Sequence, residues 1–156
     1  MCVNKKLNPY WVTGFVDGEG CFSISFTKRL YRKIKVEIRP SFSVTQLPES
    51  KHLLKELQQF FNCGSIRFSR HDGFYKYEVR SLNDLHENII PHFNKYILIS
   101  PKKENFEIFQ RICFSIKSNK YKNPETLKSI IKMAYEMNKQ GKRKYLLDDL
   151  LKLIAS

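Results

Sequence analysis

The side chains best placed to do chemistry in this sequence are two carboxylates, Asp17 and Glu19, in a glycine-rich segment. Residues Val12–Gly20 read VTGFVDGEG. Carboxylate oxygens are ligands for hard divalent cations such as Mg²⁺, and such an ion can activate water and stabilise a leaving oxygen. A short DGEG string alone is more often a turn. The chemistry therefore depends on the elements that position Glu19.

The first of these elements is a predicted short helix. Asn8 followed by Pro9 is typical of a helix start, and the glycines allow the helix to run only to about Gly18 or Gly20. A bare strip of small residues follows one face of it: Thr13, Gly14 and Gly18. Glycine inside a helix costs up to ~1 kcal/mol, which the close approach of another backbone would offset. The alternative is that Gly14 packs against the protein's own core.

A second copy of the chain is the natural partner for this strip, which we expect to form a dimer interface with Asp17 beside it. Two helices related by a twofold axis would bring Glu19 of each chain together near that axis. Crowded carboxylates repel each other, and divalent cations bound through oxygen relieve that repulsion.

Alternating residues after Gly20 predict antiparallel strands. Phe22–Thr27 alternates apolar residues with small hydroxyl residues, and the pattern resumes at Lys33–Thr45 after a basic turn near Arg29–Arg32. Strict alternation indicates one buried face and one solvent-facing face. The stretch Lys33–Thr45 would reach about 43 Å at ~3.3 Å per residue, which is long for a strand.

The remaining elements complete an α+β domain. The spacing of Leu53–Phe61 is helical, and Asn62-Cys63-Gly64 ends that helix. A second hairpin is predicted over Ser65–Arg80, followed by helices to Ala155, with Pro91 breaking one of them. The order is αββαββα plus C-terminal helices, which predicts one four-stranded antiparallel sheet backed by helices. We expect residues 1–156 to form a single domain.

The solvent-facing side of this sheet carries donors and acceptors together, a mixture that suits the reading of base edges in a major groove. An ordinary solvated sheet face is the plain alternative. The predicted face comprises Ser23, Ser25, Thr27, Lys35, Glu37, Arg39, Ser41, Ser43, Arg67, Ser69, Lys76, Glu78 and Arg80. Basic residues at the hairpin tips should reach the backbone or outer bases: Lys28, Arg29, Arg32, Arg70 and His71. Phosphate contacts are also expected from Lys117, Lys120, Lys122 and the run Lys142–Lys144, although any one of these lysines could be simply solvated.

The charge balance favours a polyanionic partner. Lys and Arg number 28 against 15 Asp and Glu, which leaves a formal charge of +13. Nucleic acid or an anionic membrane surface would satisfy this excess. Residues 1–8 lack the apolar run of a signal peptide, and the four scattered cysteines form no CxxC pair. We therefore expect an intracellular, non-secreted protein with neither structural disulfides nor zinc, and no membrane partner.

Residues Val12–Gly20 resemble the LAGLIDADG signature of homing endonucleases, with Glu19 where the eighth letter is usually Asp. Phe42–Gln46 is similar to the strand that leads to the family's active-site glutamine. His92–Tyr96 followed by Lys102 is similar to the segment after the second hairpin. Only one copy of the signature is present, as in the homodimeric members of the family.

The resemblance implies metal ligation by the Glu19 carboxylate and the Gly18 carbonyl, with Asp17 as a less favoured ligand. It also implies that Gln46 orients water and that Lys102 lies near the scissile phosphate, with Lys95 and Lys103 as rivals. A solvated lysine at a helix start is the alternative for Lys102. Family members often have a basic residue a few positions after the glutamine, whereas this chain has Ser50 and then Lys51.

The implied function is a metal-dependent double-strand break, leaving short 3′ overhangs, in a pseudo-palindromic DNA site of about 20 base pairs. Mg²⁺ or Mn²⁺ would support cleavage, and Ca²⁺ would bind without supporting it. The break would promote mobility of the host intron, in a setting that the resemblance implies to be organellar. Two alternatives stay open: an RNA-binding splicing cofactor of the host intron, and a DNA-binding regulator that no longer cuts.

Overall fold

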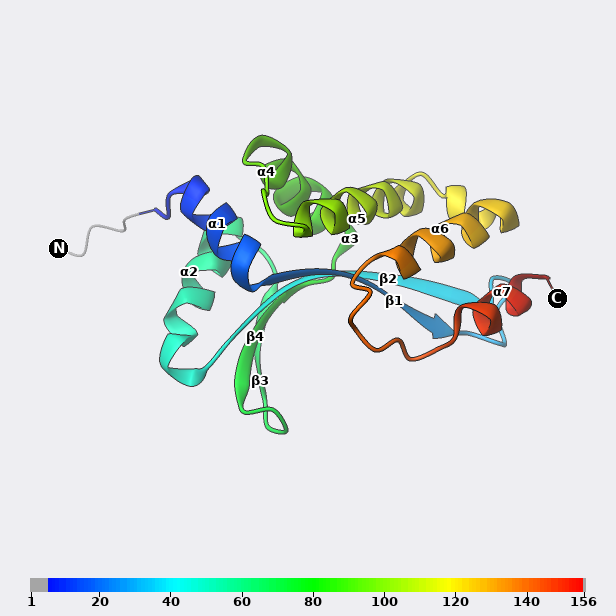
Figure 1. Cartoon of the computed structure of the whole chain (residues 1–156), viewed down its shortest axis with the longest axis horizontal. Coiled ribbons are helices and arrows are strands. Elements are labelled where there is room, and N and C mark those ends of the chain that lie inside the picture. Colours follow the sequence, from blue (N-terminus) through cyan, green and yellow to red (C-terminus); the bar gives the residue numbers. More distant parts are fainter. Residues whose placement is uncertain (1–5, 156) are drawn as a thin grey trace. The chain divides into compact units, whose positions relative to one another are not determined.

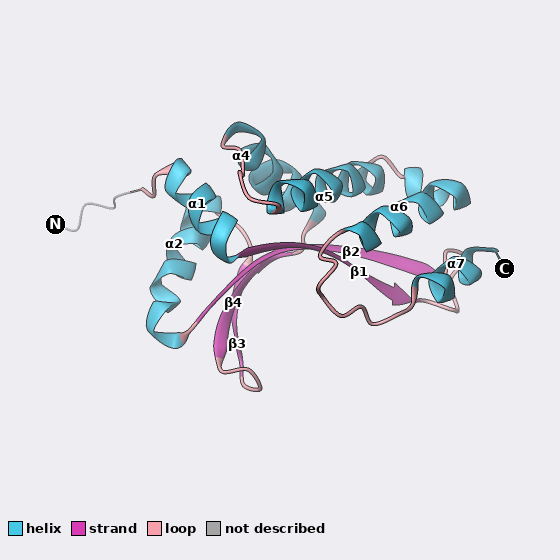
Figure 2. Cartoon of the chain, viewed as in Figure 1, coloured by secondary structure: helices cyan, strands magenta, loops and turns pink. Residues whose placement is uncertain are grey.

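The computed structural model describes residues 6–155, and its strands form one antiparallel four-stranded sheet in the order β1-β2-β4-β3. The predicted αββαββα fold with C-terminal helices is confirmed (Figures 1 and 2). The strands are β1 (Gly20–Lys28), β2 (Val36–Gln46), β3 (Ser65–Ser69) and β4 (Phe74–Val79). The helical elements are α1 (Pro9–Glu19), η1 (Pro48–Ser50), α2 (Lys51–Phe61), α3 (Leu82–Asp84), η2 (Leu85–Ile89), α4 (Ile90–Lys95), α5 (Lys102–Lys117), η3 (Lys120–Lys122), α6 (Pro124–Glu136) and α7 (Leu147–Ala155).

The chain forms two compact units. Within the described residues, one comprises residues 6–21 and 42–103, and the other comprises residues 22–41 and 104–155. Strand β2 contributes its second half to the first unit and its first half to the second unit. The first is the α1 unit and the second is the α6 unit, each named after a helix that it contains.

The α1 unit contains the second hairpin and the helices that follow it. β4 pairs with β2 from Phe42↔Val79 to Gln46↔Tyr75, and with β3 from Ser65↔Glu78 to Ser69↔Phe74. The core is built from α1, α2, the strands and the segment 85–93, and its members are nearly inaccessible: Val12, Val16, Phe42, Leu54, Leu57, Phe61, Tyr77, Val79, Leu85, Ile89 and Phe93. Burial of each such side chain stabilises the fold by about 1.5–3 kcal/mol.

The α6 unit packs the first hairpin with the C-terminal helices. Phe22 on β1 lies against Phe106 and Phe109 of α5, with ring centroids 5.1 and 5.3 Å away. Helices α6 and α7 contact each other, and both contribute to this core. The alternation predicted for β1 is confirmed, because Phe22, Ile24 and Phe26 are buried.

Helix ends follow their local sequence closely. Asn8 caps α1 by accepting the Tyr10 N–H at 2.8 Å, and Pro9 is the first helical residue, as predicted. Asn123 caps α6 in the same way by accepting from Glu125 and Thr126. At the end of α2, Asn62 adopts a left-handed conformation with φ 54°, in agreement with the predicted stop.

One predicted boundary is wrong, and one predicted break has an unexpected form. Strand β2 begins at Val36 rather than Lys33, because residues 29–35 form a closed connection in which the Arg29 N–H bonds to the Lys35 carbonyl at 2.7 Å. Lys35 therefore lies outside the strand. The helical region 82–95 is interrupted before Pro91 by a π-helical turn, Leu85–Ile89. Proline lacks an N–H and its ring clashes with the carbonyl four residues earlier, and a widened turn accommodates both.

Candidate active site and nucleic-acid interface

Helix α1 runs directly into strand β1, and Gly20 makes this junction possible. Gly20 is extended, and its N–H bonds to the Val16 carbonyl. A Cβ added to Gly20 would lie 2.5 Å from Val16 Cγ1 and 2.9 Å from Val16 O, so any larger residue would push the helix end away. This close approach fixes Glu19, the last residue of α1, at the beginning of the sheet.

The exposed Glu19 carboxylate lies beside the end of β2. Gln46, the last residue of that strand, donates from Nε2 to Glu19 Oε2 at 3.3 Å. The two residues that the sequence assigns to one site are therefore in contact within the α1 unit. An amide donor at this distance orients the carboxylate and leaves its other oxygen for a cation or water.

Lys102 approaches the same helix end from the start of α5. Its Nζ donates to the carbonyls of Val16 at 2.9 Å and Asp17 at 3.0 Å. A cation is favoured at the negative C-terminal end of a helix. Burial lowers the pKa of Lys102, while Cys21, Asp17 and Glu19 act in the opposite direction. The alternative of a simply solvated lysine is wrong.

The two rival lysines lie differently. The Lys95 ammonium is 5.5 Å from the centroid of the Tyr96 ring. Lys103 is exposed, and its backbone N–H bonds to the Ser100 carbonyl at 3.0 Å. Of the three candidates, Lys102 is the one whose ammonium contacts the end of α1.

Asp17 fastens the loop that precedes Lys102. It accepts from the N–H of Ile99 at 2.8 Å, and from the N–H and hydroxyl of Ser100 at 3.2 and 2.5 Å. Burial opposes ionisation, but these bonds outweigh it and hold the pKa of Asp17 below its usual range. Ser100 Oγ in turn accepts the Lys102 N–H at 3.1 Å. Asp17 therefore positions Lys102.

The small residues of α1 divide between two faces. Gly14 and Gly18 are exposed, and a Cβ added to either would meet no atom within 4 Å. The alternative that Gly14 packs against the chain's own core is wrong. Thr13 is buried, its hydroxyl donates to the Tyr96 carbonyl at 2.9 Å, and it lies 3.1 Å from His92 Nε2. Thr13 therefore does not belong to the bare strip, because its hydroxyl is used inside the chain.

His92 is surrounded by aromatic rings. The rings of Phe60 and Phe61 each lie 5.3 Å from it, nearly perpendicular. Burial lowers the pKa of His92 to about 4, so the ring is neutral at pH 7. His92 thus ties α4 to α1 as a neutral hydrogen-bonding group.

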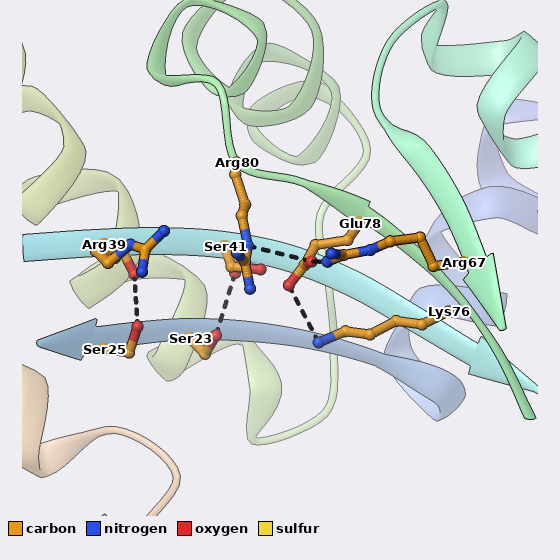
Figure 3. A network of polar contacts seen from close by, with 8 residues as sticks. All are labelled: Ser23, Ser25, Arg39, Ser41, Arg67, Lys76, Glu78 and Arg80. Atoms are coloured by element: carbon orange, nitrogen blue, oxygen red, sulfur yellow. Dashed lines mark hydrogen bonds and ion pairs between the residues drawn. The ribbon is translucent and has the colours of Figure 1, made fainter. Parts of the chain in front are cut away.

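The predicted solvent-facing side of the sheet is partly buried. Ser41, Ser43 and Glu78 are only 8%, 7% and 4% exposed, so the expectation of alternating exposure is wrong at these positions. Glu78 forms ion pairs with Arg67, Lys76 and Arg80, which are among the predicted base readers (Figure 3). Arg67 reaches Glu78 from the neighbouring strand β3, a cross-strand contact that alternation within one strand cannot reveal, whereas Lys76 and Arg80 lie two residues before and after Glu78 in the chain.

The first hairpin, in the α6 unit, uses part of its polar surface internally. Ser25 donates to the Arg39 carbonyl at 3.3 Å, and Ser23 makes a longer 3.5 Å contact to the Ser41 carbonyl (Figure 3). Arg29 Nε pairs with Glu37 at 2.6 Å. The predicted residues Thr27 and Lys28 are half-buried, whereas Arg32 and Arg39 are exposed.

At the tip of the second hairpin, an aspartate organises the turn. Asp72 accepts from the Ser69 hydroxyl at 2.7 Å and lies 3.0 Å from His71 Nδ1. These bonds hold the pKa of Asp72 below its usual range. Arg70 is exposed beside them, so the tip presents a basic side chain on an ordered turn.

A cavity of about 450 Å³ in the α6 unit brings Arg39 next to the C-terminal basic run. Lys142 and Lys144 line it from exposed positions, together with Tyr135 and Asn138, which the sequence did not single out. Arg143 behaves differently from its neighbours. It is half-buried and donates to the carbonyls of Ile24, Ala134 and Met137. The prediction that Arg143 contacts phosphate is therefore wrong, because this guanidinium anchors the loop.

The side chains that could bind a metal ion or form a disulfide are scattered over the described residues. Within residues 6–155, no cluster of three or more His, Cys, Asp or Glu side chains is placed to hold a metal ion. Cys21, Cys63 and Cys113 carry thiols, and burial raises the pKa of Cys113 to about 12. Cys2 lies outside the described residues. None of the described helices is both long and apolar enough to cross a membrane.

Relatives of this chain are named as intron-encoded and homing endonucleases. It is 33% identical over 138 residues to a probable intron-encoded endonuclease 2 of Neurospora crassa, covering 88% of this chain and 30% of that protein. It is 30% identical over 150 residues to the homing endonuclease I-ApeII of Aeropyrum pernix, covering 92% and 88%. The chain thus spans less than a third of the fungal relative and most of the archaeal one.

Solved structures of homing endonucleases have the same fold. The homing endonuclease I-TnaI superimposes with a TM-score of 0.87 at 32% identity, covering 96% of this chain and 99% of that one. The archaeal intron-encoded I-Vdi141I complexed with DNA gives 0.85 at 29% identity, covering 94% of each chain. I-SmaMI bound to an uncleaved DNA target with calcium ions also gives 0.85 at 29%, covering 97% and 50%.

The family model described as LAGLIDADG endonuclease matches residues 12–113. The match includes the signature on α1, both hairpins and Lys102. Because it spans more than half of the 156-residue chain, this protein belongs to the LAGLIDADG endonuclease family.

Proposed function

We propose that the protein is a site-specific DNA endonuclease, which works as a homodimer and hydrolyses both strands of a long duplex site with a divalent metal. The observation that carries the proposal is the joining of Glu19, Gln46 and Lys102 at one end of α1. In this arrangement the Glu19 carboxylate would bind a cation, the Gln46 amide would orient that carboxylate, and the Lys102 ammonium would offset the charge of a phosphate.

Double-stranded DNA is the proposed substrate because solved relatives, among them I-Vdi141I and I-SmaMI, are described as bound to DNA. The formal charge of +13 supports the same partner. Exposed cations on both hairpins, among them Arg39, Arg67, Arg70 and Arg80, would approach phosphates or base edges.

The donor set fits Mg²⁺ or Mn²⁺ better than zinc. Glu19 supplies a carboxylate oxygen and Gly18 a backbone carbonyl, which are hard ligands. When bound, the ion would lower the pKa of a water molecule and stabilise the leaving oxygen. We expect Ca²⁺ to occupy the site without supporting cleavage. I-SmaMI with calcium is described with its target uncleaved, which agrees with this expectation.

The count of carboxylates supports a homodimer. One chain presents one Glu19, whereas two metal-bound cuts need a carboxylate from each copy and oxygens from the DNA. The exposed strip of Gly14 and Gly18 would allow two α1 helices to pack closely. Asp17 would lie beside this contact while fastening Ser100 within its own chain.

The proposed biological role is copying a host intron into alleles that lack it, in an organelle. The names of the fungal relatives, which describe them as intron-encoded, support the intron part of this proposal. The organellar setting stays a prediction. A splicing cofactor that binds the intron RNA is the second candidate, because the same basic surface would accept a folded RNA.

One plasmid experiment tests the proposal. The protein is incubated with Mg²⁺ and supercoiled plasmid that carries the intron-free junction of its own insertion site, and products are separated on a gel. We expect a linear plasmid and short 3′ overhangs, with no product in Ca²⁺ or from a plasmid with the junction scrambled. An intact plasmid in Mg²⁺ and in Mn²⁺ would reject the endonuclease, and stimulated splicing of the intron RNA would support the second candidate.

A further inference from the structure

Strand β4 holds a carboxylate in an unusual position near its end. Glu78 pairs across the sheet with Ser43 of β2 and with Ser65 of β3. Its side chain is only 3% exposed, on the strand face that also presents Lys76 and Arg80. An ionised carboxylate so far from solvent needs close positive partners, because its desolvation is costly.

Three cations surround this carboxylate. Arg67 Nη2 lies 2.5 Å from Glu78 Oε2, Arg80 Nε lies 3.1 Å from the same oxygen, and Lys76 Nζ lies 3.1 Å from Oε1 (Figure 3). The side chains of Arg67, Arg80 and Lys76 are 62%, 53% and 40% exposed, whereas that of Glu78 is 3% exposed. The three cations therefore lie at the surface and the carboxylate lies beneath them. Three positive charges and one negative charge leave the cluster at +2.

Stability alone does not account for the cluster. A buried ion pair is often no more stabilising than apolar residues of the same volume. Its distinctive effect is to fix the conformations of the long cationic side chains before any ligand binds. Less side-chain conformational entropy is then lost on binding. The cluster also borders a surface pocket of about 240 Å³, to whose lining Arg67, Glu78 and Arg80 contribute together with Asp84.

We propose that Glu78 is a positioning residue that holds Arg67, Lys76 and Arg80 as preformed donors for guanine edges, and that it does not itself contact a base. This inference rests on the proposed function, DNA binding. It replaces the sequence-based expectation that Glu78 is one of the groups that touch DNA.

The chemistry of the exposed groups selects guanine. Arg80 uses Nε for Glu78, so its Nη1–Nη2 edge is left for a second acceptor. In the major groove, guanine presents two acceptors, N7 and O6, whereas adenine presents a donor beside N7 and cytosine presents a donor. The cluster presents three adjacent donor side chains, and its acceptor, the Glu78 carboxylate, is already engaged by them. Such a surface should favour guanines, on either strand, at neighbouring base pairs.

Glu78→Gln tests the inference, because glutamine keeps the shape but has one acceptor oxygen for three donors. Binding to a library with a randomised half-site is measured in Ca²⁺, and the wild type should select guanines at two or three adjacent base pairs. In the variant, this selection should fall by about 5- to 150-fold, the range for loss of a good bidentate contact. Binding to scrambled DNA should become tighter, because one negative charge is removed from a DNA-facing surface.

Glu125→Gln is the matched control. Glu125 makes an exposed ion pair with Lys128 on α6, so the charge change is the same, and such surface pairs contribute little to stability. The selection profile of this control should equal that of the wild type. Arg80→Lys provides a second route that keeps the charge. A lysine cannot make the bidentate contact, so guanine preference should fall most at the base pair that Arg80 contacts.

The outcomes separate the inference from the proposed function. Wild-type protein with no preference between specific and scrambled duplex would reject DNA recognition itself. Specific wild-type binding with an unchanged Glu78→Gln profile would overturn the positioning role alone. A uniform loss of affinity together with a lower melting temperature would also overturn it, since a purely structural residue would produce that result.

Discussion

Glu19 is the residue on which the proposed chemistry depends most. Glu19→Gln keeps the length of the side chain and an oxygen that can accept from Gln46, but it removes the charge that would hold a cation. Cleavage should fall at least about 100-fold, while DNA affinity should stay equal or increase, because repulsion between carboxylate and phosphate is lost. Single-turnover cleavage and gel-shift assays measure the two effects. Cleavage by the variant at a rate near that of the wild type would contradict a catalytic role for Glu19.

His92 should make folding sensitive to mild acid. Its pKa is about 4 in the folded protein because of burial, below the ordinary value of 6.5. The unfolded chain therefore binds a proton first, so the free energy of unfolding falls as the pH drops from about 6.5 to 4 and this contribution levels off below that. Urea unfolding of the wild type between pH 7 and 4.5 measures the slope.

Two variants isolate that contribution. His92→Gln should be less stable at pH 7 because it loses its packing, and its stability should vary less over the same pH range. His52 is exposed on α2, and His52→Gln should keep the wild-type pH dependence. Parallel pH profiles for wild type and His92→Gln would contradict the assignment.

At the scale of single residues, prediction from sequence succeeded where a side chain acts through its own neighbours along the chain. The Asn8 cap and the stop at Asn62 follow from local rules. The burial of Glu78 and the anchoring of Arg143 could not be predicted this way. Both depend on partners brought close by strand pairing or by helix packing, and a run such as Lys142–Lys144 does not distinguish an anchor from its solvated neighbours.

Among the elements, alternation predicted β1 well, since the buried side chains along that strand are all apolar. It misplaced the start of β2, because residues 29–35 close their own turn and leave the apolar Ile34 outside the strand. The order αββαββα was predictable because hairpins and helices have different periods. The contact between Glu19 and Gln46 was expected only from family resemblance, since no local pattern joins the ends of α1 and β2.

Helix α1 leads to a prediction about assembly. Gly14→Leu adds a side chain on the exposed strip, where an added Cβ meets nothing in its own chain. The monomer should fold and gain up to ~1 kcal/mol from better helix propensity, but two α1 helices should no longer pack. Sedimentation velocity should then change from dimer to monomer, with loss of cleavage.

Gln59→Leu is the control for that experiment. It adds an exposed leucine of equal size on another helix, α2, and should leave the protein dimeric. A Gly14→Leu protein that sediments as a dimer would place the interface elsewhere, and a wild-type monomer on its DNA site at saturating concentration would contradict dimerisation itself.

For the whole molecule, the formal charge of +13 predicts a steep dependence of DNA binding on salt. Each phosphate neutralised releases about 0.9 counterion, so about eight contacts per dimer would give a log–log slope near −7. Fluorescence anisotropy between 50 and 300 mM KCl, about the range in which such slopes are resolved, gives the value. A shallow slope with equal affinity for specific and scrambled duplexes would contradict the DNA account.

The shared carboxylate of Glu78 has a consequence for any change of target sequence. Because three donors use the same anion, replacing one of them shifts the positions of the other two, and the effects of substitutions should not add. A lineage that follows a drifting insertion site, or an engineer who redirects the protein, would pass through poorly selective intermediates when changing Arg67, Lys76 and Arg80 one at a time. New specificity at this end of the sheet should therefore arise by exchanging the whole cluster together.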